Sequence, residues 1–226
     1  MKYENITQAK FIDRPNRFIA NIEIRGKPEI CHVKNTGRCK ELLISGAKIY
    51  VQESGSKTRK TKYDLISVEK NGKLVNIDSQ APNKVFAEWI RQGNLFCKEA
   101  VIKTEAKHAS SRFDFYIEDK GNKSFIETKG ATLEKDGIAM FPDAPTLRGV
   151  KHIQDLVGAV NEGYLAYMVF IIQMEPVFRF TPNKETHPEF ADALRAAKNA
   201  GVEILAFDCI VSADAIKAKG PIEVVL

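Results

Sequence analysis

The sequence predicts an α/β protein, α+β overall, in which a small β-barrel over residues 1–80 precedes an α/β/α domain over residues 81–226. Two observations predict this division. Short segments of alternating apolar residues, separated by turn residues, fill the first part, which is typical of an all-β unit. After residue 83 the expected order is helix, three strands, helix, strand, helix, strand, which favours a mixed sheet with helices on both faces.

Composition and charge are those of a soluble globular protein, with 44% hydrophobic and 28% charged residues. The formal net charge of +5 is compatible with a polyanionic partner. Residues 1–11 lack an apolar signal core, and the longest apolar run, residues 165–172, is too short to span a bilayer. The four cysteines lack CxxC spacing and suggest reduced thiols. We therefore expect a cytoplasmic protein without a membrane partner, and the oligomeric state stays open.

The first part is expected to contain five strands and one short helix at residues 38–44. The strands alternate in polarity and cover residues 17–25, 29–33, 47–52, 63–69 and 73–77. Short strands at this density favour a barrel of the oligonucleotide-binding (OB) type. The loop at residues 54–62 carries four cations and no acid, so it is a candidate phosphate contact or a solvated loop. The candidate contacts are Lys57, Arg59, Lys60 and Lys62.

The second part is expected to alternate helices and strands. The predicted helices carry apolar stripes at helical spacing and cover residues 84–92, 146–161 and 188–200. Asn83 is the expected cap of the first helix, and Asp143 is expected to cap the second or to reach a metal. The predicted strands share β-forming residues and cover residues 96–105, 112–118, 123–129, 164–173 and 202–211.

The chemistry is concentrated in a predicted β-hairpin over residues 112–129, with its turn at residues 120 and 121. Cross-strand partners then have numbers that add to 241, as 120 and 121 do, which places Asp114 opposite Glu127. Strand alternation puts these two carboxylates on one face together with Lys129 and with Arg112, which is a candidate nucleic-acid contact. The opposite face suits a core and carries Phe113, Phe115, Ile117 and Ile126.

Two adjacent carboxylates repel each other, and a divalent cation removes that cost. Hard oxygen ligands suit Mg²⁺ (or Mn²⁺), so we expect Asp114 and Glu127 to bind such an ion. Lys129 beside the metal would hold or polarise a water for attack on a phosphate. The alternative is an ordinary amphipathic hairpin whose ion pairs lie on a solvated face.

An Asp followed one strand later by Glu-x-Lys is the pattern of metal-dependent nucleases with a restriction-endonuclease-like fold. The order of the first six predicted elements matches the core of that fold, and the pattern lies on its second and third strands. Glu88 on the preceding helix is a third candidate metal ligand, or a surface residue. Arg148, Lys151 and His152 share one face of the following helix. Either that face clamps the scissile phosphate, with Arg148 on the nucleic acid and His152 as a proton carrier, or it is the charged solvent side of a helix N-terminus.

The chain resembles the sugar fermentation stimulation protein A family over nearly its whole length. The resemblance rests on the combination and order of residues 35–37, 112–115, 126–129, 141–144, 146–152 and 201–206. It implies an OB-like N-terminal barrel, a nuclease-like C-terminal domain and DNA as the partner. Three functions stay open: a Mg²⁺-dependent phosphodiesterase, a non-catalytic DNA-binding regulator of sugar catabolism that retains a nuclease scaffold, and a protein-interaction module.

Overall fold

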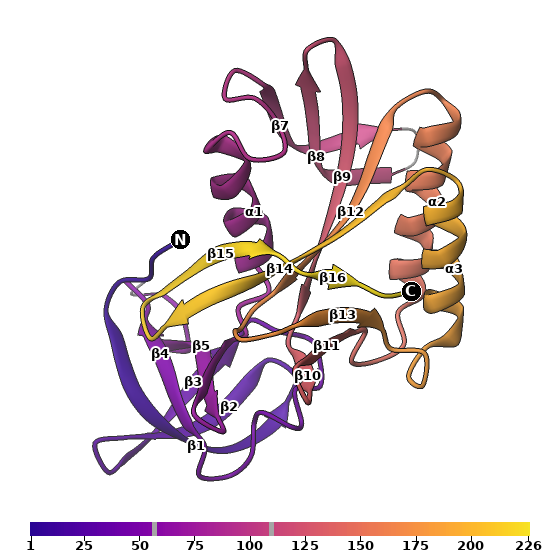
Figure 1. The fold of residues 1–226 in the computed structure, drawn as a ribbon. Coiled ribbons are helices and arrows are strands. Elements are labelled where there is room, and N and C mark those ends of the chain that lie inside the picture. Colours follow the sequence, from indigo (N-terminus) through magenta and orange to yellow (C-terminus); the bar gives the residue numbers. More distant parts are fainter. Residues whose placement is uncertain (56–57, 109–110) are drawn as a thin grey trace.

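The computed structural model describes residues 1–55, 58–108 and 111–226 (Figure 1). The N-terminal barrel lies at one end of the molecule, and the larger sheet with its three helices extends from it. In the part of the chain that is described, no helix combines the length and apolar character needed to cross a membrane.

The predicted barrel is confirmed, and it is closed by pairing between β3 and β5. Its strand order is β3-β2-β1-β4-β5, with β6 beside β5. The strands are β1 (Ile6–Asn16), β2 (Ile19–Ile24), β3 (Lys27–Val33), β4 (Lys48–Glu53), β5 (Tyr63–Lys70) and β6 (Lys73–Asn76).

Two predictions for the barrel were wrong. The sequence analysis missed β1, because this strand is irregular and buries only Ala9 and Phe11, so its alternation is weak. The short helix expected at residues 38–44 is a series of turns. Cys39 has a positive φ of 46°, which a right-handed helix does not allow.

The second part is built on a mixed sheet, as predicted; it has six strands in the order β15-β14-β12-β9-β8-β7. Strands β9, β12 and β14 are parallel, and the flanking pairs are antiparallel. The strands are β7 (Val101–His108), β8 (Ser111–Asp119), β9 (Asn122–Ala131), β12 (Leu165–Ile172), β14 (Glu203–Ser212) and β15 (Ala215–Pro221).

Helices cover both faces of this sheet. Helix α1 (Ala81–Arg91) packs on one face in a core that includes Phe115 and Ile126. Helices α2 (Leu147–Asn161) and α3 (Pro188–Asn199) pack on the other, in a core that includes Phe113 and Phe125. The two faces of the β8–β9 hairpin therefore meet different helices.

A small sheet that the sequence analysis missed lies between the barrel and the helices (Figure 1). Its strands are short and come from distant parts of the chain, so they leave little local signal. They are β10 (Leu133–Lys135), β11 (Ile138–Phe141), β13 (Arg179–Pro182) and β16 (Glu223–Val224).

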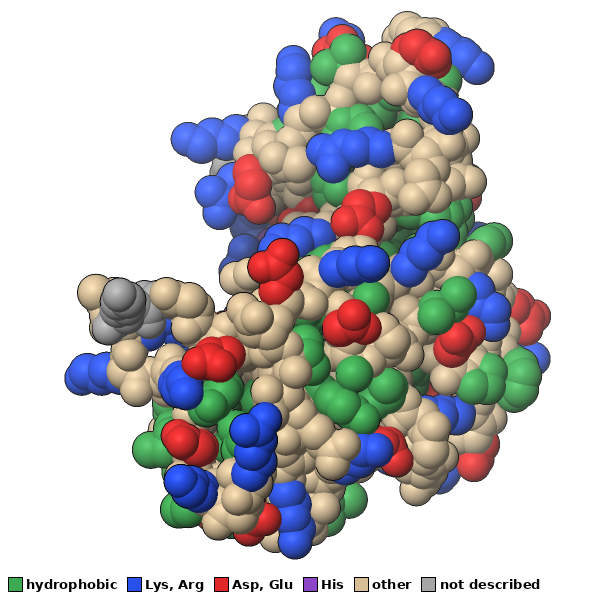
Figure 2. Space-filling model, turned by 90° about the vertical axis from the view of Figure 1, so that its left-hand side faces the viewer, with side chains coloured by type: hydrophobic (Ala, Val, Ile, Leu, Met, Phe, Trp, Pro, Cys, Tyr) green, Lys and Arg blue, Asp and Glu red, His purple; other side chains and the backbone are tan. Residues whose placement is uncertain are grey.

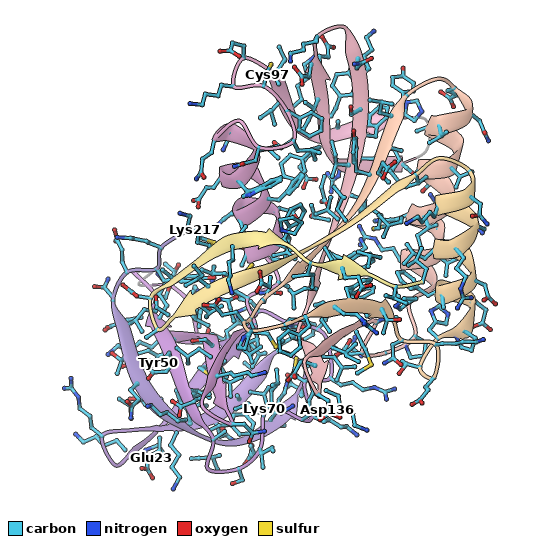
Figure 3. All side chains as sticks on the ribbon, viewed as in Figure 1. Glu23, Tyr50, Lys70, Cys97, Asp136 and Lys217 are labelled. Carbon is cyan, nitrogen blue, oxygen red and sulfur yellow. The ribbon has the colours of Figure 1, made fainter. Side chains whose placement is uncertain are left out.

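The two parts of the chain share one continuous apolar core, which contains residues of the barrel together with residues of α2 and α3. A buried polar contact joins them as well. The Gln173 side chain donates to Asn76 Oδ1 at 2.8 Å and to the Asp78 carbonyl at 3.0 Å. Lys70 of the barrel and Asp136 of the second part, both labelled in Figure 3, line one hollow of about 330 Å³.

Candidate functional site

The predicted hairpin forms with the predicted register. Every pair in the β8–β9 ladder, from Asp119 opposite Asn122 back to the Phe115 pair, has residue numbers that add to 241. The ladder stops there, one residue before Asp114. Beyond it the Thr128 N–H donates to the Asp114 side chain at 2.8 Å instead of to a backbone carbonyl. Asp114 thus lies where the two strands cease to pair.

Asp114 is held by hydrogen bonds from β9 and α1. One carboxylate oxygen accepts from the Thr128 N–H and hydroxyl, both at 2.8 Å, and the other accepts from Asn83 Nδ2 at 2.8 Å. The Thr128 hydroxyl also bonds to the Asn83 amide oxygen. Burial raises the pKa of the Asp114 carboxyl, and the negative charge of Glu127 raises it further, against the hydrogen bonds from Thr128.

Glu127 lies at the centre of a second cluster, which faces α2. Glu127 is 2% exposed, and its Oε1 bonds to both Lys129 Nζ and His152 Nδ1. Burial acts to raise the pKa of Glu127, but the hydrogen bond from His152 and the charge of Lys129 outweigh it and hold this pKa low. Arg148 Nε approaches His152 Nε2 at 3.2 Å. A neutral His152 that donates from Nδ1 and accepts at Nε2 satisfies both contacts.

The hydrogen bonds of Asp114 and Glu127 run to opposite sides of the sheet, which corrects the expectation that they share one face. Glu127 bonds toward α2. Asp114 bonds toward α1 and to the side chain of Thr128, which directly follows Glu127 in the sequence and so points to the opposite face of the strand. Regular alternation fails near Asp114, since Phe113 packs on Phe125 at 5.0 Å and not in the core of Phe115. The end of the ladder explains this, because unpaired backbone leaves the side chain free to turn.

The carboxylate oxygens near the hairpin suit a hard cation in part. Glu127 Oε2 is buried and has no hydrogen-bond partner within the described residues, so one carboxylate oxygen stays available. The charges of Asp114 and Glu127 act on each other. Glu88, the predicted third ligand, instead bonds to the Met1 amino group at 2.5 Å. Among the described residues no three His, Cys, Asp or Glu side chains come together as a metal-holding group.

The structure directs two predicted phosphate contacts elsewhere. Lys151 Nζ donates to Ser111 Oγ and to Asp155, each at 2.8 Å, and does not join the Glu127 cluster. Arg112 forms an exposed ion pair with Glu105 at 2.9 Å. Both cations therefore have an acidic partner within the chain.

The basic loop expected to contact phosphates is partly neutralised. Arg59 binds both oxygens of Asp64, at 2.6 and 3.0 Å, and Lys62 pairs with Glu53 at 3.2 Å. On the face shown in Figure 2, Lys and Arg side chains are interspersed with Asp and Glu and form no continuous basic patch. Of the other two predicted contacts, Lys60 is exposed, and Lys57 lies outside the described residues.

Both helix caps proposed from sequence were wrong. Asn83 lies inside α1, which begins two residues earlier, so its amide is free to hold Asp114. The cap of α2 is Thr146, whose hydroxyl accepts from the Gly149 N–H at 3.0 Å. Asp143 instead accepts from the Arg38 N–H of the barrel at 2.8 Å. Contacts between such distant segments leave no local signal in the sequence.

Comparison with known protein families places both parts of the chain. Residues 80–215 match the sugar fermentation stimulation protein RE domain, and residues 12–77 match the SfsA N-terminal OB domain.

Relatives extend this match over the full chain. A sugar fermentation stimulation protein homolog from Clostridium beijerinckii is 55% identical over 226 residues and covers 100% of both chains. A homolog from Desulfitobacterium hafniense is 57% identical over 96% of this chain and 95% of its own. A structure of Pyrococcus furiosus SfsA in complex with Ca²⁺ superposes with a TM-score of 0.90 at 33% identity, covering 100% of this chain and 98% of that one. The chain therefore belongs to the sugar fermentation stimulation protein family.

Proposed function

We propose that this protein binds DNA and hydrolyses its phosphodiester bonds at the site formed by Asp114, Glu127 and Lys129, with Mg²⁺ or Mn²⁺ as cofactor. The observation that carries the proposal is the unpartnered buried oxygen of Glu127 beside the Lys129 ammonium. A buried, unsatisfied carboxylate oxygen is costly, and a cation ligand would remove that cost. The Pyrococcus furiosus relative, described in complex with Ca²⁺, supports a divalent ion bound by oxygen.

Each residue of the proposed site has a separate role in the proposed hydrolysis. Glu127 would hold the metal through its unpartnered Oε2. Asp114 would become the second ligand by leaving its hydrogen bonds with Thr128 and Asn83 and turning toward Glu127. The metal, when bound, would act as a Lewis acid on the phosphate. Lys129 Nζ, tied to Glu127, presents a fixed positive charge that orients a water and offsets phosphate charge. His152 holds a proton at Nδ1 against Glu127 and is positioned by Arg148. Arg148 is exposed at the start of α2, where its guanidinium can meet a phosphate oxygen.

A non-catalytic DNA-binding regulator is the second candidate. It is favoured by the engagement of both Asp114 oxygens in hydrogen bonds and by the lack of a third acidic ligand among the described residues. Such a protein would keep the scaffold and the DNA surface without turnover.

A cleavage assay separates the two functions. Labelled single- and double-stranded DNA and RNA are incubated with the parent and with Asp114→Asn and Lys129→Ala, in Mg²⁺, Mn²⁺ or EDTA. The proposal expects metal-dependent cleavage that both variants lose, because the first removes a metal ligand and the second the charge beside the water. Asp136→Asn is the matched control, since Asp136 is an exposed turn residue outside the hairpin.

Metal binding has its own readout. Added Mg²⁺ should raise the melting temperature of the parent by mass action and should do so less in Asp114→Asn. A parent protein that binds DNA but shows neither a metal-dependent rise in melting temperature nor cleavage would favour the non-catalytic regulator over the nuclease.

A further inference from the structure

A hollow of about 750 Å³ lies between the barrel and the second part of the chain. Its barrel wall comes from the end of β1 and from the loop after β3. Its other wall includes Gly130 and Thr146. Gly130 directly follows Lys129, and Thr146 caps the helix that begins with Leu147 and Arg148. The hollow therefore ends beside the two sequence segments that supply the proposed catalytic groups.

Uncompensated positive charge lines this hollow. Arg14, Arg17, Arg38 and Lys40 contribute to its surface, and Asp143 is the one acid among its lining residues. Within the described residues, none of these four cations forms an ion pair with an acid, in contrast to Arg59 and Lys62 of the loop. The Asp143 carboxylate is already engaged by the Arg38 backbone N–H. An anion entering the hollow would meet these cations without displacing an acidic side chain from any of them.

Arg14 shows that part of this charge is built in. Its guanidinium donates to the backbone carbonyls of Arg17, Asn35, Gly37 and Arg38 at distances of 2.6 to 3.0 Å. Carbonyl dipoles fix the orientation of the group but leave its full charge uncancelled. Arg14 thus organises the loop around residues 35–38 and holds a permanent positive charge at the wall of the hollow.

We propose that this hollow, named here the interdomain groove, binds the phosphates of a single nucleic-acid strand and leads that strand to Lys129. Its volume lies within the ~300–1,000 Å³ of ordinary ligand pockets, which suits a few nucleotides of one strand. A duplex would touch only the rim. OB barrels commonly bind single strands, and Met140 and Phe141 add apolar surface for bases. The inference rests on the proposed function and specifies the form of its substrate.

The test removes charge from the interdomain groove without touching Arg14. The groove variant is Arg17→Ala/Arg38→Ala/Lys40→Ala. A control variant removes three exposed lysines elsewhere, Lys123→Ala/Lys198→Ala/Lys217→Ala. Fluorescence anisotropy measures binding of a labelled 12-nucleotide DNA strand, its RNA counterpart and a DNA duplex over a range of salt. EDTA is present to prevent cleavage.

The groove variant is expected to bind the single strand at least tenfold more weakly at about 0.1 M salt. Its slope of log K against log salt should fall by about 2, because each single-strand phosphate contact contributes about 0.7. The control variant should keep the parent slope. Thr36→Trp fills the groove without changing charge and should also weaken single-strand binding.

Three outcomes are decisive. Equal losses in the groove and control variants, or unchanged binding by both groove substitutions, would overturn the inference while leaving nucleic-acid binding intact. A parent that prefers the duplex, with the groove variant affecting both forms alike, would also overturn it. A parent that binds none of the probes would instead refute the proposed function.

Discussion

Gly130→Ala tests how tightly the strand that carries the site is packed against α1 and against Gln173. A Cβ added at Gly130 would lie 2.4 Å from Gln173 Oε1 and 2.7 Å from Pro82 Cγ, both within hard contact. Pro82 is fixed in the first turn of α1, and Gln173 is buried. The extra methyl must therefore displace a buried hydrogen-bonded side chain.

The magnitude follows from what Gln173 would lose. Its amide makes two buried hydrogen bonds, to Asn76 and to the Asp78 carbonyl, and an unsatisfied buried group costs about 1–3 kcal/mol. Overpacking a filled core costs about 1–3 kcal/mol more. We expect Gly130→Ala to lower the free energy of unfolding by about 2–6 kcal/mol, a large part of the ~5–15 kcal/mol of a typical domain.

Urea denaturation followed by circular dichroism measures this change. The matched control is Gly158→Ala, because Gly158 lies within α2 and an added Cβ there has no atom within 4 Å. That variant should gain about 0.5–1 kcal/mol, since alanine favours a helix over glycine. A Gly130→Ala protein as stable as the parent would refute the packing argument.

Three further predictions concern single contacts. Burial acts to raise the pKa of Asp64, but the hydrogen bond from Arg59 and the charge of Lys34 lower it from 3.8 to about 2. The stability that this carboxylate contributes is therefore present above pH 3.8 and is lost as the pH falls toward 2. Urea titrations should show that the difference in free energy of unfolding between the parent and Asp64→Asn shrinks by about 2 kcal/mol as the pH falls through that window. A difference that stays constant with pH would contradict the lowered pKa of Asp64. Arg59→Ala should cost more stability than Lys60→Ala in the same assay, because only the first leaves Asp64 without its bidentate partner. Thr146→Ala should cost about 1 kcal/mol, as a lost N-cap does, and Thr146→Ser should restore it.

The local sequence pattern was sufficient to predict the β8–β9 hairpin and the register of its strands. The turn at Lys120 and Gly121 fixes which residues oppose each other, and the pairing observed from Asp119 to Phe115 follows directly. The order of elements likewise predicted the mixed sheet, because each helix and strand carries its own periodicity. These features depend on residues that are close in sequence.

Features that depend on distant partners were not accessible in this way. The turning of Asp114 toward Asn83 requires the end of the ladder, which no pattern in residues 112–129 indicates. The basic loop looked free because its neutralising acid, Asp64, lies just outside it on β5. The interdomain groove joins residues 14–40 to residues 130–146 across two folds, so sequence alone gave no reason to group them.

The shared apolar core has a consequence for the way this protein opens. Because barrel residues and residues of α2 and α3 belong to one cluster, separating the two parts would expose a large apolar surface. The molecule should therefore unfold in one cooperative transition, with no populated state in which the barrel stands alone. It follows that the walls of the interdomain groove cannot swing apart as a hinge would allow. A bound strand would enter a preformed channel, and little of its binding free energy would be lost to ordering the protein.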